Sequence, residues 1–125
     1  LHKHPQTLPD FDLKTIKAVQ GIGGVCNEGF KDWFDAFEYM KAEINKSNYD
    51  ICILGCGAYG FPLAAHIKRM GKKAIHMGGA TQMLFGIKGK RWEDEYGEFM
   101  NEHWIRPSKE ETPINAMKIE NGCYW

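Results

Sequence analysis

The most regular pattern in this chain is an apolar stripe with helical spacing between residues 30 and 45. Large apolar side chains recur there at intervals of three and four residues, with charged residues between them. Because an α-helix makes one turn in 3.6 residues, this spacing places the apolar side chains on one face. The stripe consists of Phe30, Trp33, Phe34, Phe37, Met40 and Ile44. It predicts a helix that packs this face against a sheet.

Three further segments have the character of strands. Residues 51–54 form a continuous apolar run, which is typical of a strand covered on both faces in a parallel sheet. Residues 73–77 are predicted as a second core strand, and residues 14–20 as a shorter third one. The segment between the first two is predicted to be helical, with Pro62 in its first turn and Gly71 at its end.

Strands near 14–20, 50–55 and 73–78 that alternate with helices predict an α/β fold, because such alternation produces parallel strands. We expect a single Rossmann-like three-layer domain over residues 1–125, with a short parallel sheet. After Gly79 the pattern predicts a short helix at 80–85, a basic loop at 86–91 and a helix at 92–104. The tail, residues 106–125, is predicted to pack as an irregular strap, since its apolar side chains are unfavourable in water.

A glycine motif provides the sharpest indication of chemistry. Gly55, Gly57 and Gly60 form a G-x-G-x-x-G pattern, with Tyr59 inside it, directly after a predicted buried strand and before a predicted helix. Glycines allow a tight turn and a close approach of the backbone, and a helix N-terminus presents free N–H groups to an anion. The motif therefore favours an anion or nucleotide site over a turn that binds nothing.

Polar residues after the second predicted strand extend this site. His76 lies at the carboxyl end of that strand, where α/β sites form, and is either a catalytic base or phosphate contact or a buried structural histidine. Thr81 and Gln82 follow the Gly78–Gly79 turn and either bind the same ligand or cap a helix. A dinucleotide site usually has an acidic residue at this strand end, and none is present. An NAD(P)-dependent oxidoreductase is therefore the second choice.

The basic loop offers a second set of ligand contacts. Lys88, Lys90 and Arg91 lie beside Gly86 and Gly89, so the loop combines mobility with three cations that suit a diphosphate. The alternative is a solvated surface loop. Acid-x-acid patterns at residues 10–12 and 93–95 are too short to predict a metal site. No Ser-His-Asp order, nucleophile elbow or P-loop is present in the sequence.

Composition narrows the classes of partner. The chain has 16 Lys and Arg and 16 Asp and Glu, so its net charge gives no reason to expect nucleic acid or a membrane surface. Its apolar runs are too short to span a bilayer. Four cysteines without a C-x-x-C pair favour reduced thiols and a cytoplasmic protein over a disulfide framework or a zinc site. The chain begins with Leu1 and not with Met, which indicates the carboxyl-terminal part of a longer protein.

Residues 50–66 (DICILGCGAYGFPLAAH), 73–82 (KAIHMGGATQ), 85–92 (FGIKGKRW) and 121–125 (NGCYW) together resemble a bacterial family associated with surface polysaccharide synthesis. That family is similar to the carboxyl half of GT-D-fold glycosyltransferases. The resemblance covers roughly residues 33–125.

The resemblance implies a glycosyltransferase, or its nucleotide-binding half, with a nucleotide-sugar donor and a divalent metal as cofactors. It implies that Gly55, Gly57 and Gly60 form the phosphate turn, and that His76, Gly78 and Gly79 form the second strand end. The acidic metal motif of GT-D enzymes has no match at any position here. A non-catalytic ligand-binding or assembly module is the third alternative, and self-association into a homo-oligomer stays open.

Overall fold

The computed structural model describes residue 2, residues 7–21 and residues 29–125. Its contacts divide the chain into two compact units. Unit 2 comprises Lys14–Thr81, and unit 1 comprises Leu1–Leu13 with Gln82–Trp125. The predicted α/β class is confirmed, whereas within the described ranges the sheet has two strands.

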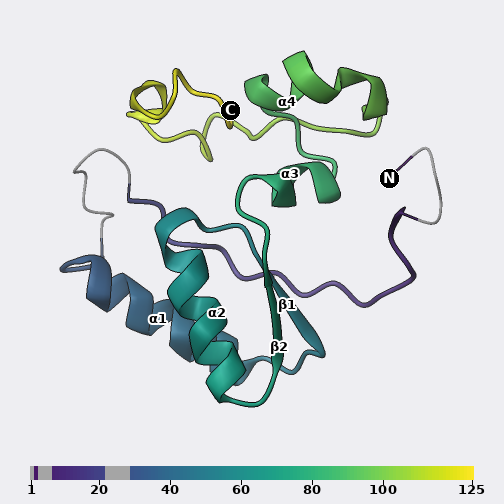
Figure 1. Ribbon diagram of the computed structural model, residues 1–125. Coiled ribbons are helices and arrows are strands. Elements are labelled where there is room, and N and C mark those ends of the chain that lie inside the picture. The colour runs from purple at the N-terminus through teal and green to yellow at the C-terminus, as the bar shows by residue number, and fades with distance from the viewer. Residues whose placement is uncertain (1, 3–6, 22–28) are drawn as a thin grey trace. The chain divides into compact units, whose positions relative to one another are not determined.

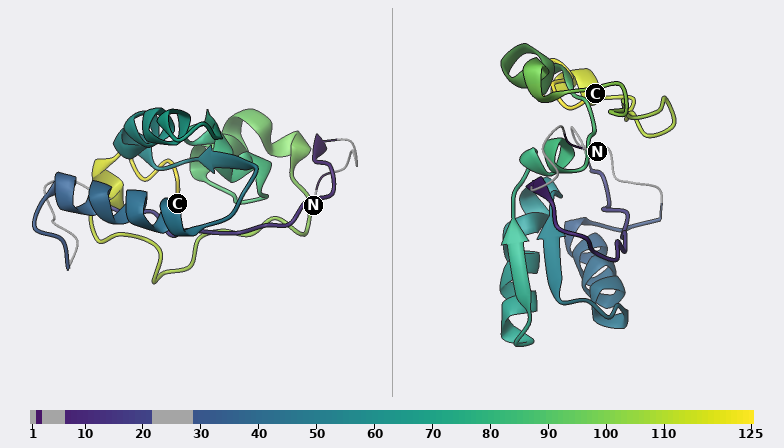
Figure 2. Two further views of the ribbon diagram at one scale, coloured as in Figure 1. Left: turned by 90° about the horizontal axis from the view of Figure 1, so that it is seen from below. Right: turned by 90° about the vertical axis from the view of Figure 1, so that its right-hand side faces the viewer.

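Unit 2 is built around a strand–helix–strand sequence. Strand β1 (Ile51–Leu54) pairs with β2 (Lys73–His76) in parallel, with Ile51 opposite Lys73 and Leu54 opposite His76. Helix α2 (Gly60–Arg69) connects them and contacts both strands. Figures 1 and 2 show the two strands side by side with α2 along them. The predicted start and end of α2 are confirmed, because Pro62 lies in its first turn and Gly71, with φ of +76°, follows its last residues.

Helix α1 (Trp33–Lys46) confirms the predicted amphipathic helix, although it begins three residues later than the stripe. The carboxylate of Asp32 caps it by accepting a hydrogen bond from the Asp35 N–H at 2.9 Å. Its buried residues are Ala36, Met40 and Ile44. They form one core with Leu54, Tyr59, Leu63 and Ile67. The core of unit 2 therefore lies where α1 and α2 meet β1.

The predicted strand at residues 14–20 is wrong, because this segment has no regular secondary structure and lies outside the sheet. Ala18 and Val19 pack against the core of unit 2, and the Lys14 ammonium donates to the Asn48 carbonyl at 2.7 Å. Packing and this side-chain contact account for its apolar pattern without a hydrogen-bond ladder. The expected cover on both faces of the sheet is also incomplete, since Ile51 and Ile75 are half exposed. A three-layer Rossmann-like arrangement is not confirmed.

Unit 1 contains two short helices, α3 (Ala80–Leu84), whose first two residues belong to unit 2, and α4 (Lys90–Tyr96). The predicted helix at 80–85 is confirmed. The predicted helix at 92–104 is wrong in both bounds, because α4 gives way to a 3₁₀ turn at Gly97–Phe99 and the backbone is extended at Met100. Residues 87 and 105 pair in an isolated parallel bridge, which requires extended chain on both sides.

The tail of unit 1 ends in an unusual turn. A 3₁₀ turn at Ala116–Lys118 is followed by three consecutive residues with positive φ, Glu120, Asn121 and Gly122. Cys123 beyond them is buried, while Met117 is exposed. Among the helices in the described part of the chain, none is both long and apolar enough to cross a membrane.

Candidate functional site

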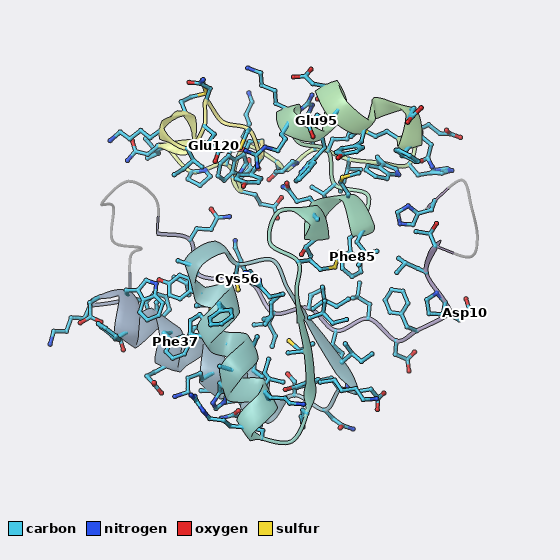
Figure 3. All side chains as sticks on the ribbon, in the orientation of Figure 1. Asp10, Phe37, Cys56, Phe85, Glu95 and Glu120 are labelled. Atoms are coloured by element: carbon cyan, nitrogen blue, oxygen red, sulfur yellow. The ribbon has the colours of Figure 1, made fainter. Side chains whose placement is uncertain are left out.

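The glycine motif forms a turn between β1 and α2, as its sequence context predicts. Gly57 has φ of +53°, and a 3₁₀ turn at Gly57–Tyr59 leads directly into α2. Cys56 lies at this end of α2 in Figure 3. No side chain caps the helix and no acidic residue lies in its first turn. The first N–H groups of the segment therefore lack a capping side chain and leave a partial positive charge at this end.

Each motif glycine has its own geometric reason. A Cβ on Gly55 would lie 2.6 Å from the Thr81 hydroxyl oxygen, and one on Gly60 would lie 2.2 Å from Cε1 of His76. A Cβ on Gly57 would meet nothing within 4 Å. The first and third glycines thus let the β2 end pack against the turn, while the middle one has a left-handed backbone beside open space. The second and third glycines thus have the geometry that nucleotide-binding turns require at these positions, namely a bare backbone and close helix–strand packing.

The last carbonyl of β1 contacts several residues at the end of β2 and in the loop after it. The Leu54 oxygen accepts hydrogen bonds from the backbone N–H groups of Met77 at 3.0 Å and Gly78 at 3.3 Å. His76 Nδ1 lies 3.2 Å from the same oxygen, and the Thr81 hydroxyl donates to it at 3.5 Å. The structure therefore brings His76, Gly78 and Thr81 together with the glycine turn, and Gly79 lies in the same loop.

The contact with Leu54 also sets the proton position on His76. A carbonyl oxygen only accepts hydrogen bonds, so the Nδ1 atom carries the proton. In the neutral ring Nε2 is then the acceptor, and the His76 residue is exposed. This histidine is therefore not the buried structural residue of the alternative prediction. Its Nε2 atom can take a proton from a ligand.

The cysteines of this region have the opposite character. Burial raises the pKa of the Cys56 thiol, and it raises the pKa of the Cys52 thiol on β1. A raised pKa keeps the thiol protonated, and a protonated thiol is a poor nucleophile. Cys56 therefore contributes backbone and packing to the turn rather than a reactive sulfur.

The other four predicted ligand residues, Gln82, Lys88, Lys90 and Arg91, lie in unit 1. The Gln82 amide donates to the Tyr124 carbonyl at 2.9 Å and accepts from the Trp92 indole N–H at 3.1 Å. Its amide thus holds the tail and α4 together. Sequence reasoning assigned this residue to a ligand or to a helix cap because contacts 10 and 42 residues away leave no local signal.

The basic loop is shorter than predicted, because α4 begins at Lys90. The Lys88 N–H donates to the Ile105 carbonyl at 2.7 Å, and Lys90 and Arg91 are the first residues of α4. The Arg91 guanidinium pairs with Glu120 and donates to the Tyr124 hydroxyl at 3.2 Å. The predicted loop at 86–91 is therefore shorter than expected, because residues 90 and 91 belong to α4, and the tail contacts Arg91.

An open hollow of about 260 Å³ lies beside these contacts in unit 1. Acidic residues line it together with the two cations: Lys90, Arg91, Asp94, Glu95, Glu120, Asn121 and Cys123. Figure 3 shows Glu95 and Glu120 on α4 and on the tail. Three carboxylates around two cations make this hollow unfavourable for a diphosphate. Within the described ranges no group of three or more His, Cys, Asp and Glu is placed to hold a metal ion, so we assign no metal ligand.

Sequence reasoning missed one feature next to the glycine turn. The stripe predicts that Trp33 and Phe34 are buried, yet Phe34 is 70% exposed and Trp33 37%. Trp33 stacks on Tyr59 of the turn, with ring centres 4.8 Å apart and planes 6° apart. The only signal in the sequence was the density of aromatic residues at the start of this helix.

Comparison with known proteins adds no relative: no family model, no curated protein and no solved structure matches this chain.

Proposed function

We propose that unit 2 binds the diphosphate of a nucleotide sugar at the Gly55–Gly60 turn and acts as the nucleotide-binding part of a glycosyltransferase. The observation that carries the proposal is Gly57. It combines a φ of +53° with open space in front of its Cα, between a parallel strand and an uncapped helix. An anion can approach the bare backbone there and accept hydrogen bonds from the first N–H groups of the helical segment.

The reaction class is the one that the family resemblance implies. The hydroxyl oxygen of an acceptor would attack the anomeric carbon of the donor, and the bond from that carbon to the diphosphate oxygen would break. The nucleoside diphosphate would leave with the bonding electrons, and the proton of the hydroxyl would pass to Nε2 of His76. The helix end would stabilise the negative charge on the leaving group.

The residues around β2 favour this reading over an oxidoreductase. Residues 73–79 contain no Asp or Glu to hold ribose hydroxyls in the usual dinucleotide manner. They supply instead an exposed histidine with its Nδ1 proton committed to Leu54. We further propose a cytoplasmic location, which the free thiols of Cys52, Cys56 and Cys123 support.

A matched pair of glycine variants tests the binding site. Gly57→Ala and Gly71→Ala both place a Cβ at a positive φ, and neither Cβ meets an atom within 4 Å. Both variants therefore carry similar backbone strain of roughly 1–2 kcal/mol. Only Gly57 lies in the turn, while Gly71 lies at the other end of α2. In calorimetric titrations with nucleoside diphosphates, Gly57→Ala should lose binding and Gly71→Ala should keep it.

Equal affinity in the two variants would overturn the site. Activity is tested separately, by incubation of the full chain with sugar nucleotides and detection of released nucleoside diphosphate. His76→Gln should abolish the release of nucleoside diphosphate from the sugar nucleotide. Its affinity for the nucleoside diphosphate should stay within about twofold of that of the parent chain. Release that His76→Gln does not change would remove this histidine from the mechanism.

A further inference from the structure

Three aromatic rings connect the start of α1 to the glycine turn, and we call Trp33, Phe34 and Tyr59 the aromatic ledge. Trp33 lies parallel to Tyr59, and Phe34 meets Trp33 edge-on, with ring centres 5.2 Å apart and planes 86° apart. Phe37 also stacks on Trp33 at 5.2 Å. The indole is therefore held between other rings, which fixes the place of its neighbour Phe34.

Exposure rises steadily along the ledge away from the turn. Tyr59 is 8% exposed, Trp33 37% and Phe34 70%. The outer ring is thus a large apolar surface in water, whereas the Tyr59 ring at the other end is buried. Aromatic rings in this position bury substantial area when a flat partner covers them. A ligand that reaches from the turn to Phe34 would gain this contact.

We propose that Phe34, positioned by Trp33, stacks against the base of the nucleotide. This inference rests on the proposed function, since it names the part of the ligand that leaves the phosphate turn. A nucleotide joins an anionic group to a flat aromatic ring, and the ledge joins the anion-binding turn to a flat exposed ring through Tyr59. Stacking of this kind accepts any base, because every base has a π-face.

The charges of α1 set the orientation of the ligand. Asp32 at the N-cap and Asp35 in the first turn of α1 lie close to Phe34 in the chain. The Asp32 carboxylate accepts from the Asp35 N–H at 2.9 Å, and the Asp35 carboxylate accepts from the Lys31 N–H at 3.1 Å. Two carboxylates disfavour phosphate at this position. The neutral base is therefore the end of the nucleotide that suits the ledge, and the phosphates suit the helix α2 end.

Three variants of the full chain separate stacking from other effects. Phe34→Ala removes the exposed ring, and Phe34→Tyr keeps it. Tyr39→Ala removes another exposed ring of α1, which contacts Phe30 with ring centres 5.1 Å apart. Each is titrated with the four common nucleoside diphosphates, with the corresponding nucleosides and with inorganic pyrophosphate. Thermal melts confirm folding, which the exposure of both sites favours.

Phe34→Ala should weaken nucleoside diphosphate binding by about five- to a hundredfold, which is the range for one base stacked on an aromatic ring. Its affinity for pyrophosphate should stay unchanged, and Phe34→Tyr and Tyr39→Ala should bind both ligands as the parent chain does. Unchanged diphosphate binding in Phe34→Ala, or an equal loss of pyrophosphate, overturns the stacking role.

The outcomes also distinguish this inference from the proposed function. If the parent chain binds pyrophosphate as tightly as nucleoside diphosphates, phosphate binding at the glycine turn is supported and base stacking on the aromatic ledge is refuted. If the parent chain binds nucleosides but not pyrophosphate, and Phe34→Ala does not bind nucleosides, base stacking on the aromatic ledge is supported and phosphate binding at the turn is refuted. Binding of none of these ligands refutes both.

Discussion

Different interactions stabilise the two units of this chain. Unit 2 has a contiguous core in which Met40, Leu63 and Ile67 are fully buried. In the described part of unit 1 the buried apolar residues are Trp104, Ala116 and Cys123, and polar contacts from Gln82 and Arg91 connect α4 with the tail. Non-directional apolar burial therefore dominates in unit 2, whereas directional contacts between distant residues dominate in unit 1.

Charge follows the same division. The segment Lys14–Thr81 carries nine Lys and Arg against six Asp and Glu, and the rest of the chain carries seven against ten. The excess of cations thus belongs to the unit that contains the glycine turn, and the overall neutrality conceals it. The positive net charge of unit 2 contrasts with the acidic lining of the hollow in unit 1.

The largest effect should come from the core of unit 2. Ile67 has no exposed surface, and Ile114 in unit 1 is fully exposed. Ile67→Ala should lower the free energy of unfolding by about 2–5 kcal/mol through lost burial and a new cavity, whereas Ile114→Ala should change it by less than about 0.5 kcal/mol. Urea unfolding of the two variants measures the difference. Similar unfolding midpoints for the two variants would show that Ile67 of α2 does not contribute to the core as described.

A second large effect should follow removal of the tail end. Deletion of residues 122–125 removes the carbonyls that accept from the Arg91 N–H and from the Gln82 amide, and it removes two aromatic side chains. We expect a loss of a few kcal/mol, since both rings are partly buried and a fully buried aromatic ring contributes ~2 kcal/mol or more. Hydrogen exchange should accelerate at Lys88 and Ile105, whose N–H groups bond within unit 1. An unchanged exchange rate at both amides would show that the tail does not hold this unit.

The same division explains what the sequence could predict. In unit 2 the decisive information is local: the apolar stripe predicts α1, Gly71 ends α2, and the glycine motif stands between an apolar run and a helix. The prediction of a strand at residues 14–20 fails because alternation of apolar and polar residues does not distinguish a paired strand from an irregular segment. Here Ala18 and Val19 of such a segment pack on the core.

In unit 1 the decisive contacts join residues far apart in the chain. The sequence around Arg91 predicts a phosphate ligand, whereas in the structure its guanidinium contacts Glu120 and Tyr124. These two residues are 29 and 33 positions away in the sequence. Phe34 shows the converse problem within unit 2, because a helical stripe predicts which side chains share a face but not where the covering sheet stops. No property of the sequence alone resolves either case.

A smaller effect distinguishes two glycines of unit 1. A Cβ on Gly89 would lie 3.1 Å from the carbonyl oxygens of Cys123 and Tyr124, while one on Gly97 would meet nothing within 4 Å at a helical φ of −55°. Gly89→Ala should destabilise the chain by roughly 1–2 kcal/mol, because backbone atoms of the tail must move. Gly97→Ala should stabilise it by about 0.5–1 kcal/mol through a less flexible unfolded state. Thermal melts that shift in the same direction would contradict the close approach of the tail.

The smallest effect concerns titration in unit 2, where polar contacts should contribute least. His66 on α2 lies 2.9 Å from the Asn45 amide oxygen, and burial, followed by the nearby Lys41 charge, lowers its pKa below the ordinary 6.5. The unfolded chain therefore binds a proton at His66 more readily than the folded chain does. Stability from this residue is complete above pH 6.5 and falls as the pH drops through 6.5 toward the lower folded value. His66→Gln keeps an amide donor for Asn45 and removes the titration, so its unfolding midpoint should fall slightly less than that of the parent chain between pH 7.5 and pH 5. A parent chain that instead gains stability relative to His66→Gln over this range would show that the charged imidazole is favoured in the fold, through Glu38 rather than against Lys41.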